Sequence, residues 1–330
     1  MEAFVRGPHH YFLPTTTERD AFGLGRGGRA WPDQTIEIDP ADVADAGIDA
    51  VVLQRVDEIP RAERLLRQRL GTDIPAFYVE HNAPRLDIPS TRHPLADSDT
   101  VTIVHVSHFN QLMWDCGTAR TVVIEHGVPD PGALYTGRLP RMGAVINDPV
   151  RRWRVTGTDL LPLFAEVAPV DLFGMGSSGL DERFADDPSY RPPSHPINTH
   201  GDLPNTAMHA ELAQRRLYIH PLRWTSLGLS LLEAMHLGMP VVALATTEAI
   251  RAVPPEAGAI STNVDDLIGA ARRLIDDPDE AQHKGQAARA FVREHYGLDN
   301  FLAAWTHLLE GASTPTRALL TNAITERAYQ

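Results

Sequence analysis

Side chains that could do chemistry gather in one stretch of the sequence, residues 217–244. Thr225 and Ser226 stand where a helix N-cap belongs, and hydroxyl groups suit that position. The free N–H groups and the dipole of a helix N-terminus favour a phosphate. Glu233 lies beside an apolar helix face, where a carboxylate is rarely buried without a partner. The stretch therefore predicts a phosphate site with a carboxylate close to it.

The elements that must position these residues read as part of a parallel α/β sheet. Residues 217–220 and 241–244 are short apolar strands. The helix between them has an apolar face at residues 229, 232 and 235, and Gly238 followed by Pro240 ends it. A strand, a turn, a helix and a second strand are the unit from which parallel sheets are built.

This stretch resembles the donor-binding signature of retaining nucleotide-sugar glycosyltransferases with two Rossmann-like domains, the GT-B architecture. It is most similar to family four of these enzymes, the glycosyl transferases group 1. The family pattern L-L-E-A-M-x-x-G-x-P-V-V-A is matched from Leu231 to Ala243, and Gly228 matches the glycine before it. Residues 171–176 resemble the family's I-V-G-x-G turn, and residues 125–130 resemble its hinge between domains.

The resemblance implies roles for particular residues. Glu233 is expected to hold the nucleotide ribose, because the second of two family Glu residues does so. The first Glu, which faces the donor sugar, is replaced here by Thr225. The donor is expected to lie on the turn formed by Thr225, Ser226, Leu227 and Gly228.

Two other groups of residues could take part in sugar transfer. Arg152 and Arg154 stand where the family has a basic pair, and a guanidinium can hold phosphate oxygens bidentately. A solvated basic turn is the alternative reading of these arginines. His81 ends an apolar strand, at the sheet edge where parallel sheets place ligands, and is our candidate catalytic residue. The alternative is a surface histidine, in a chain that has 15 of them.

A metal site is not expected. His195, His200, His209 and His220 have no zinc spacing, and the single cysteine, Cys116, is distant in sequence. His105, within a strand, is expected to be packed in a core. By resemblance, the co-substrate is a nucleotide-diphosphate sugar and no metal or other cofactor is required.

The amino-acid composition narrows the classes of binding partner and the cellular compartment that fit this chain. Lys and Arg number 30 and Asp and Glu 43, so the formal net charge is −13, which argues against nucleic acid. One cysteine permits no intrachain disulfide, which fits a reducing cytoplasm. No apolar run approaches the ~18 residues of a transmembrane helix. Peripheral contact with a membrane stays compatible with this composition.

The alternating strands and helices predict an α/β chain of two Rossmann-like domains with a cleft between them. We expect an N-terminal, acceptor-side domain at 1–137, a C-terminal donor domain at 138–311 and a loose tail at 312–330. Residues 177–200 are expected to be irregular. Met1 falls directly before Ala3–Val5, which look like the helix after the first strand and loop of a GT-B domain. That first strand is therefore expected to be missing here, either because this sequence starts too late or because the chain has lost a loop on the acceptor side.

Three functions stay open at this point. The first is a glycosyltransferase that moves a sugar to an acceptor hydroxyl on a small molecule, a lipid or a glycan, with retention. The second is a nucleotide-sugar 2-epimerase of the same fold, although no matching set of acidic residues stands out. The third is a pseudoenzyme that binds a nucleotide sugar without turnover, which Thr225 in place of Glu would allow.

Overall fold

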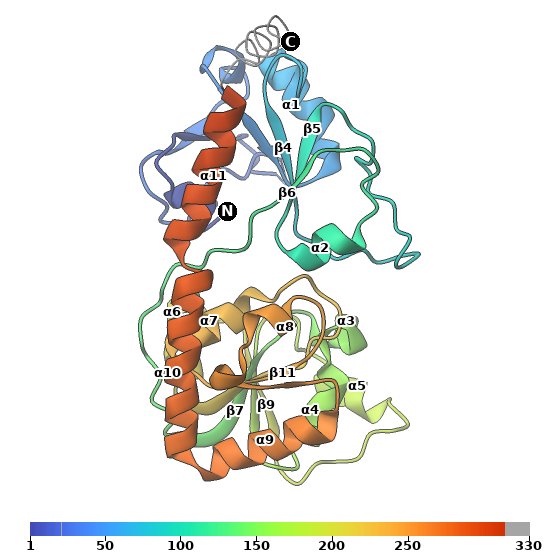
Figure 1. Cartoon of the computed structure of the whole chain (residues 1–330), viewed down its shortest axis with the longest axis vertical. Coiled ribbons are helices and arrows are strands. Elements are labelled where there is room, and N and C mark those ends of the chain that lie inside the picture. Colours follow the sequence, from blue (N-terminus) through green and yellow to red (C-terminus); the bar gives the residue numbers. More distant parts are fainter. Residues whose placement is uncertain (21, 314–330) are drawn as a thin grey trace, which may run out of the picture. The chain divides into compact units, whose positions relative to one another are not determined.

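The computed structural model describes residues 1–20 and 22–313 and shows two compact units (Figure 1). The first unit contains Met1–Val106, Asn110–Glu125 and the chain from Asp299. The second contains Ser107–Phe109 and His126–Leu298. Each is an α/β unit with a parallel sheet, as the sequence predicts.

The first unit has two parallel sheets. One pairs β1 (Tyr11–Pro14) with β2 (Thr35–Ile38). The other has the order β3-β4-β5-β6. Its strands are β3 (Val51–Leu53), β4 (Ala76–Glu80), β5 (Val101–His105) and β6 (Thr121–Val123). Neighbours along β4 face opposite sides of the sheet, so Phe77 and Tyr78 enter two different apolar clusters.

Helices cover both faces of this sheet. Helix α1 (Ile59–Leu66) packs with the cluster around Tyr78. Helix α11 (Leu298–Ser313) covers the Phe77 face with the buried ring of Trp305. The ring of Phe4, in the 3-10 helix Phe4–Arg6, makes an edge contact with Trp305 at 4.8 Å between centroids. Two segments from opposite ends of the sequence therefore share one apolar layer.

The second unit contains a six-stranded parallel sheet of order β12-β11-β10-β7-β8-β9. Its strands are β7 (Leu139–Val145), β8 (Val170–Phe173), β9 (Ile197–Gly201), β10 (Arg215–His220), β11 (Val241–Leu244) and β12 (Gly258–Ser261). Successive connections run outward from β7 in one direction and from β10 in the other. The order therefore reverses between these two central strands.

Its helices form two layers, one on each face of the sheet. One apolar cluster joins the sheet to α7 and α10, and another joins it to α9, α4 and α5. The helices are α3 (Pro149–Thr156), α4 (Leu161–Phe164), α5 (Leu180–Ala185), α6 (Asn205–Leu212), α7 (Leu229–Leu237), α8 (Ala249–Ala252), α9 (Val264–Asp276) and α10 (Pro278–His295). The short α2 is His108–Met113.

The units differ from the predicted domain limits of 1–137 and 138–311 in two places. Residues 126–137 lie with the second unit, where the Val128 N–H donates to the carbonyl of Tyr296 at 3.1 Å. Residues from Asp299 lie with the first unit, because α11 covers its sheet. Most of the predicted tail, residues 314–330, lies outside the described residues.

One further difference concerns a segment of the second unit. Residues 177–200, expected to be irregular, contain α5 and most of β9.

None of the helices in residues 1–20 and 22–313 combines the length and hydropathy that spanning a bilayer requires.

Candidate functional site

The fold places the most favourable ligand position at one edge of the second sheet. Ligands of open parallel sheets bind at the carboxyl ends of strands where the strand order reverses. Here that point lies between β7 and β10. The loops that follow these strands are residues 146–148 and residues 221–228. The second of them leads directly into α7, which begins at Leu229.

The start of α7 is shaped by a close contact with His220, the last residue of β10. A Cβ atom on Gly228 would lie 2.6 Å from Cε1 of His220, so only glycine fits without a shift. His220 is 2% exposed, and this burial lowers its pKa to about 4. Its ring is therefore neutral at pH 7, and it supports the helix start without adding charge.

The predicted N-cap of α7 was wrong. The helix begins two residues after Leu227, its N-cap is Gly228, and no side chain caps it. Ser226 is buried instead: its Oγ lies 2.8 Å from Oγ of Ser107, and its carbonyl accepts from the Glu248 N–H. Thr225 is half-buried. In the described chain, no acceptor lies on the N–H groups of Leu229 or Ser230, so these donors stay open to a ligand.

Leu227 has a structural role in this turn. It is 6% exposed and packs in the apolar cluster between the sheet and α7. Its side chain therefore anchors the turn, and any contact it makes with a donor would come from the backbone.

Glu233 lies on α7 one turn after Leu229. Residues four apart share a helix face, so the carboxylate follows the open N–H groups at about 6 Å along the axis. Its side chain is 21% exposed, and Oε2 lies 3.5 Å from Nε2 of His209 on α6. The carboxylate is thus partly desolvated and still reachable, as a group that binds a ribose hydroxyl must be.

The two arginines of α3 precede a glycine at which a helix begins. Arg152 and Arg154 lie on either side of Trp153, whose backbone (φ 32°, ψ −98°) is not helical, and Gly157 is the N-cap of the 3-10 helix Thr158–Leu160. Arg152 is half-buried, and Arg154 is 71% exposed and pairs with Asp159 at 3.0 Å. Their assignment to the diphosphate stays a prediction.

Arg223 is a cation near the turn that sequence reasoning missed. It lies in the loop after β10, and its guanidinium donates two hydrogen bonds, of 2.5 and 2.9 Å, to the carboxylate of Asp159. Its N–H donates to the carbonyl of Val155 on α3 at 2.9 Å. Arg154 and Arg223 share one carboxylate, so the group keeps a positive charge beside the turn. The sequence contains one indication of this cation, because Arg223 stands only two residues before Thr225 in the same loop.

Hydrogen bonds and a close backbone contact join the loop after β8 to the loop after β7. Gly174 has φ +118°, and a Cβ atom there would lie 2.4 Å from the carbonyl oxygen of Ile146. The Met175 N–H donates to Oδ1 of Asn147 at 3.1 Å, and the Asp148 N–H donates to Met175 O at 2.9 Å. The glycine turn that the sequence indicated thus builds one wall of this sheet edge.

His81 belongs to the first unit. It directly follows β4 and its side chain is exposed, at the carboxyl edge of the four-stranded sheet as predicted. His105 is fully buried, as expected of a core histidine, and burial lowers its pKa to about 4. His81 is therefore available for chemistry and His105 is not.

The other histidines do not converge on one point. His200 stacks on Phe173 at 4.6 Å, and His209 lies by Glu233. Among the described residues, no three His, Cys, Asp or Glu side chains are placed to hold a metal ion.

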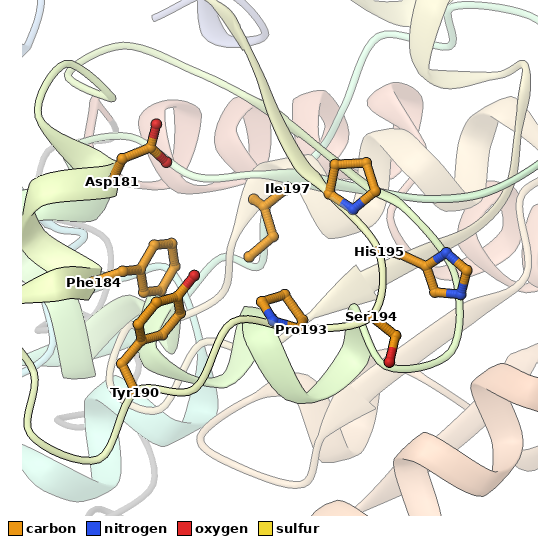
Figure 2. Close-up of a pocket in the computed structure, with 8 residues that line it drawn as sticks. Asp181, Phe184, Tyr190, Pro193, Ser194, His195 and Ile197 are labelled. Atoms are coloured by element: carbon orange, nitrogen blue, oxygen red, sulfur yellow. The ribbon is translucent and has the colours of Figure 1, made fainter.

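A hollow of about 320 Å³ lies elsewhere in the second unit, between α5 and the segment that leads into β9 (Figure 2). The ring of Tyr190 stacks on Phe184 there, with centroids 5.2 Å apart, and His195 lies on the opposite wall. The hollow contains none of the predicted donor-binding residues. The sheet topology, and not this hollow, therefore indicates the candidate site in this unit.

Comparisons with known proteins agree with the sequence motif. Residues 163–277 match the family model of glycosyl transferases group 1. No curated protein sequence matches the chain. Solved structures match over both units at low identity, which shows the fold alone.

Three of these structures illustrate the match. Sucrose-phosphate synthase from Thermosynechococcus elongatus has a TM-score of 0.62 and 16% identity, over 81% of this chain and 74% of that one. HepE of Anabaena, in complex with UDP, has a TM-score of 0.60 and 15% identity, over 82% of each chain. S. aureus TarM, in a complex that includes UDP, has a TM-score of 0.58 and 15% identity, over 76% of this chain.

The matched part of TarM is only 54% of its chain, so this protein spans about half the length of that relative. The family match contains α7, Glu233 and the turn before them. Residues 163–277 thus match the family that the sequence motif resembles, and the fold is the GT-B fold of two Rossmann-like domains.

Proposed function

We propose that this protein is a glycosyltransferase that moves a sugar from a nucleotide-diphosphate sugar to an acceptor hydroxyl, with retention. One observation carries the proposal. Glu233 lies partly exposed one turn after the open N-terminus of α7, at the point where the strand order reverses. A carboxylate and a phosphate-binding helix start at this spacing suit a ribose and the diphosphate attached to it.

The arrangement provides for the charge that develops during transfer. Breaking the bond between the sugar and the diphosphate puts negative charge on the leaving group. The open N–H groups of Leu229 and Ser230, with the dipole of α7, stabilise that charge. Arg223 and Arg154 add a net positive charge close to the turn. His81 is the residue that we assign to the acceptor side.

UDP is the nucleotide that we expect. HepE and TarM were solved with UDP, and so was the pneumococcal O-GlcNAc transferase GtfA. These proteins share the fold at low identity, so they support the choice of base and leave the sugar open. The acceptor belongs to one of three chemical classes, a small molecule, a lipid or a glycan.

A thermal-shift panel tests the donor assignment. UDP, GDP, ADP and their glucose or mannose conjugates are added at equal concentration, and a ligand that binds the native state raises Tm. We expect UDP and a UDP-sugar to raise Tm and the other nucleotides to have little effect. No shift with any nucleotide would contradict the proposal.

One alternative has an observation in its favour. Thr225 replaces the acidic residue that faces the donor sugar in the family, so the chain could bind a nucleotide sugar without transferring it. Release of UDP that depends on an added acceptor separates the two functions. Binding of a UDP-sugar without such release, across panels of the three acceptor classes, would favour the pseudoenzyme.

A further inference from the structure

A cluster of buried polar side chains in the first unit surrounds the backbone next to His81. Glu80, the last residue of β4, is 4% exposed, and His93 is 2% exposed. Nε2 of His93 lies 3.1 Å from Oε2 of Glu80. Burying a carboxylate costs free energy unless hydrogen bonds satisfy it, and an apolar pair of similar size is often as stable. The cluster therefore needs an explanation beyond stability.

The hydrogen bonds fix the protonation of His93. Its Nδ1 accepts from the Leu95 N–H at 3.0 Å, so that nitrogen carries no proton. The proton is then on Nε2, which donates to Glu80. The rings of Tyr78 and Trp114 hold the imidazole by edge contacts at 5.4 and 5.1 Å. His93 is thus a neutral, buried donor that fixes one carboxylate oxygen of Glu80.

The other groups of the cluster all bind the backbone on either side of His81. Oε1 of Glu80 accepts from the Asn82 N–H at 2.7 Å. The Asn110 side-chain amide donates to the carbonyls of Glu80 and Asn82, each at 3.2 Å. Nε1 of Trp114 donates to the same Asn82 carbonyl at 2.8 Å. Four hydrogen bonds therefore converge on a turn of three residues.

We propose that Glu80, His93, Asn110 and Trp114 are positioning residues that hold the turn Glu80–Asn82 and so present the exposed ring of His81. The inference rests on the proposed function where it gives His81 a part in transfer. The fixed turn limits where the imidazole can reach, and a misplacement of about 1 Å can cost ~10²-fold in rate. The cluster acts only through His81 and touches no substrate.

Two substitutions of His93 separate positioning from packing. His93→Gln keeps an N–H donor for Glu80, whereas His93→Phe keeps the ring volume and removes the donor. The first readout is hydrogen exchange of the Asn82 amide in the full chain without ligand. We expect exchange to be about tenfold faster or more in His93→Phe than in the parent, and close to the parent in His93→Gln.

The second readout is kinetic. With the UDP-sugar that raises Tm most, we expect His93→Phe to lower kcat for UDP release about 10- to 100-fold, with KM for the donor little changed. In a His81→Ala background the same substitution should have almost no further effect, because the cluster acts through His81. Trp305→Phe changes a buried tryptophan in the apolar cluster around Phe77, away from the polar cluster; it is the control and should leave both readouts unchanged.

The outcomes are distinct. Exchange at Asn82 that is the same in His93→Phe as in the parent overturns the positioning role, and so does a kcat loss that persists fully in the His81→Ala background. If His81→Ala alone leaves kcat unchanged while exchange still increases, the role of His81 in transfer fails and the positioning of the turn stands. Should His93→Phe fail to fold, Trp114→Phe removes a single N–H from the turn and takes its place in both assays.

Discussion

The four-stranded sheet and the six-stranded sheet each bury an acid, and the two acids are satisfied in different ways. Asp171 on β8 is 1% exposed and is held by cations: Arg215 donates to it at 2.8 Å and Arg141 at 3.2 Å. Glu80 at the end of β4 is held by the neutral His93 and by backbone groups. The first acid joins neighbouring strands inside a sheet. The second fixes a turn that presents one exposed side chain.

The hydrogen-bond partners of these acids distinguish an acid that stabilises the fold from one that positions or binds another group. Asp171 also accepts from Asn198 at 2.8 Å, so these hydrogen bonds come from side chains on other strands of its own sheet. Glu80 directs its bonds to the backbone beside His81. Glu233 is a third case: it is partly exposed, and its Oε2 lies 3.5 Å from Nε2 of His209. By this comparison, we expect Asp171 to contribute to stability, Glu80 to position the turn beside His81, and Glu233 to bind the donor.

The largest expected effect is on stability. Asp171→Asn leaves the buried Arg215, which is 4% exposed, without its main counter-charge. Removing one partner of a buried ion pair costs about 3–5 kcal/mol, so we expect the free energy of unfolding to fall by that amount. Urea denaturation followed by circular dichroism measures it. Glu80→Gln should cost less, because its partner is neutral, and an equal loss for both would break the comparison.

The pH dependence of stability should come from Asp171 as well. Burial alone would raise its pKa, but the hydrogen bonds from Asn198 and Arg215 outweigh burial and hold the pKa below its ordinary value. A lowered pKa in the folded state gives stability that is present above the unfolded pKa of about 4 and is lost as the pH falls further. We expect a drop in Tm below about pH 4 that is much smaller in Asp171→Asn. An identical drop in both proteins would assign it to other acids.

The next effect concerns the start of α7. Gly228→Ala places a methyl group against His220 and should move the open N–H groups. We expect overpacking to cost about 1–3 kcal/mol of stability and UDP affinity to fall with it. Gly269→Ala is the control: it lies in α9 with nothing within 4 Å of the added carbon, and it should stabilise by about 0.5–1 kcal/mol. Calorimetry with UDP and thermal unfolding follow both variants.

The smallest effect is expected at Thr225. Because Gly228 is the N-cap of α7, Thr225→Ala should change the free energy of unfolding by less than about 0.5 kcal/mol. Thr225→Glu should not raise turnover, since a carboxylate would then stand beside the diphosphate. A large gain in turnover would show instead that the sugar site lacks only this acid.

The sequence predicted more of the fold than of the site. Apolar strands such as residues 241–244 and the stop signal at Gly238 and Pro240 specify local structure, and the structure has both. β9 was missed because Ile197 is its one large apolar residue and the strand lies at a sheet edge, so it lacks the continuous apolar run of an inner strand. The N-cap was misplaced because hydroxyl residues suit a cap wherever they occur, whereas the contact of Gly228 with His220 exists only in the folded chain.

The site residues that were missed share one property. Arg223 and His209 act through partners far away in sequence, Asp159 and Glu233. The turn Glu80–Asn82 likewise depends on His93, which binds Glu80, and on Trp114, which binds Asn82, and no local pattern joins these residues to the turn. Motif and spacing can mark a residue that touches a ligand, but the residues that hold it are defined by tertiary contacts.

The central claim is that Glu233 binds the nucleotide of the donor. Isothermal titration of UDP into the parent, Glu233→Gln and Glu182→Gln tests it most directly. Glu182 is an exposed acid on α5 in the same unit and controls for the loss of one charge. We predict that Glu233→Gln weakens UDP binding by about 1–3 kcal/mol, the cost of losing a charge-assisted hydrogen bond, while Glu182→Gln leaves it unchanged. Equal UDP affinity in all three proteins would contradict the account.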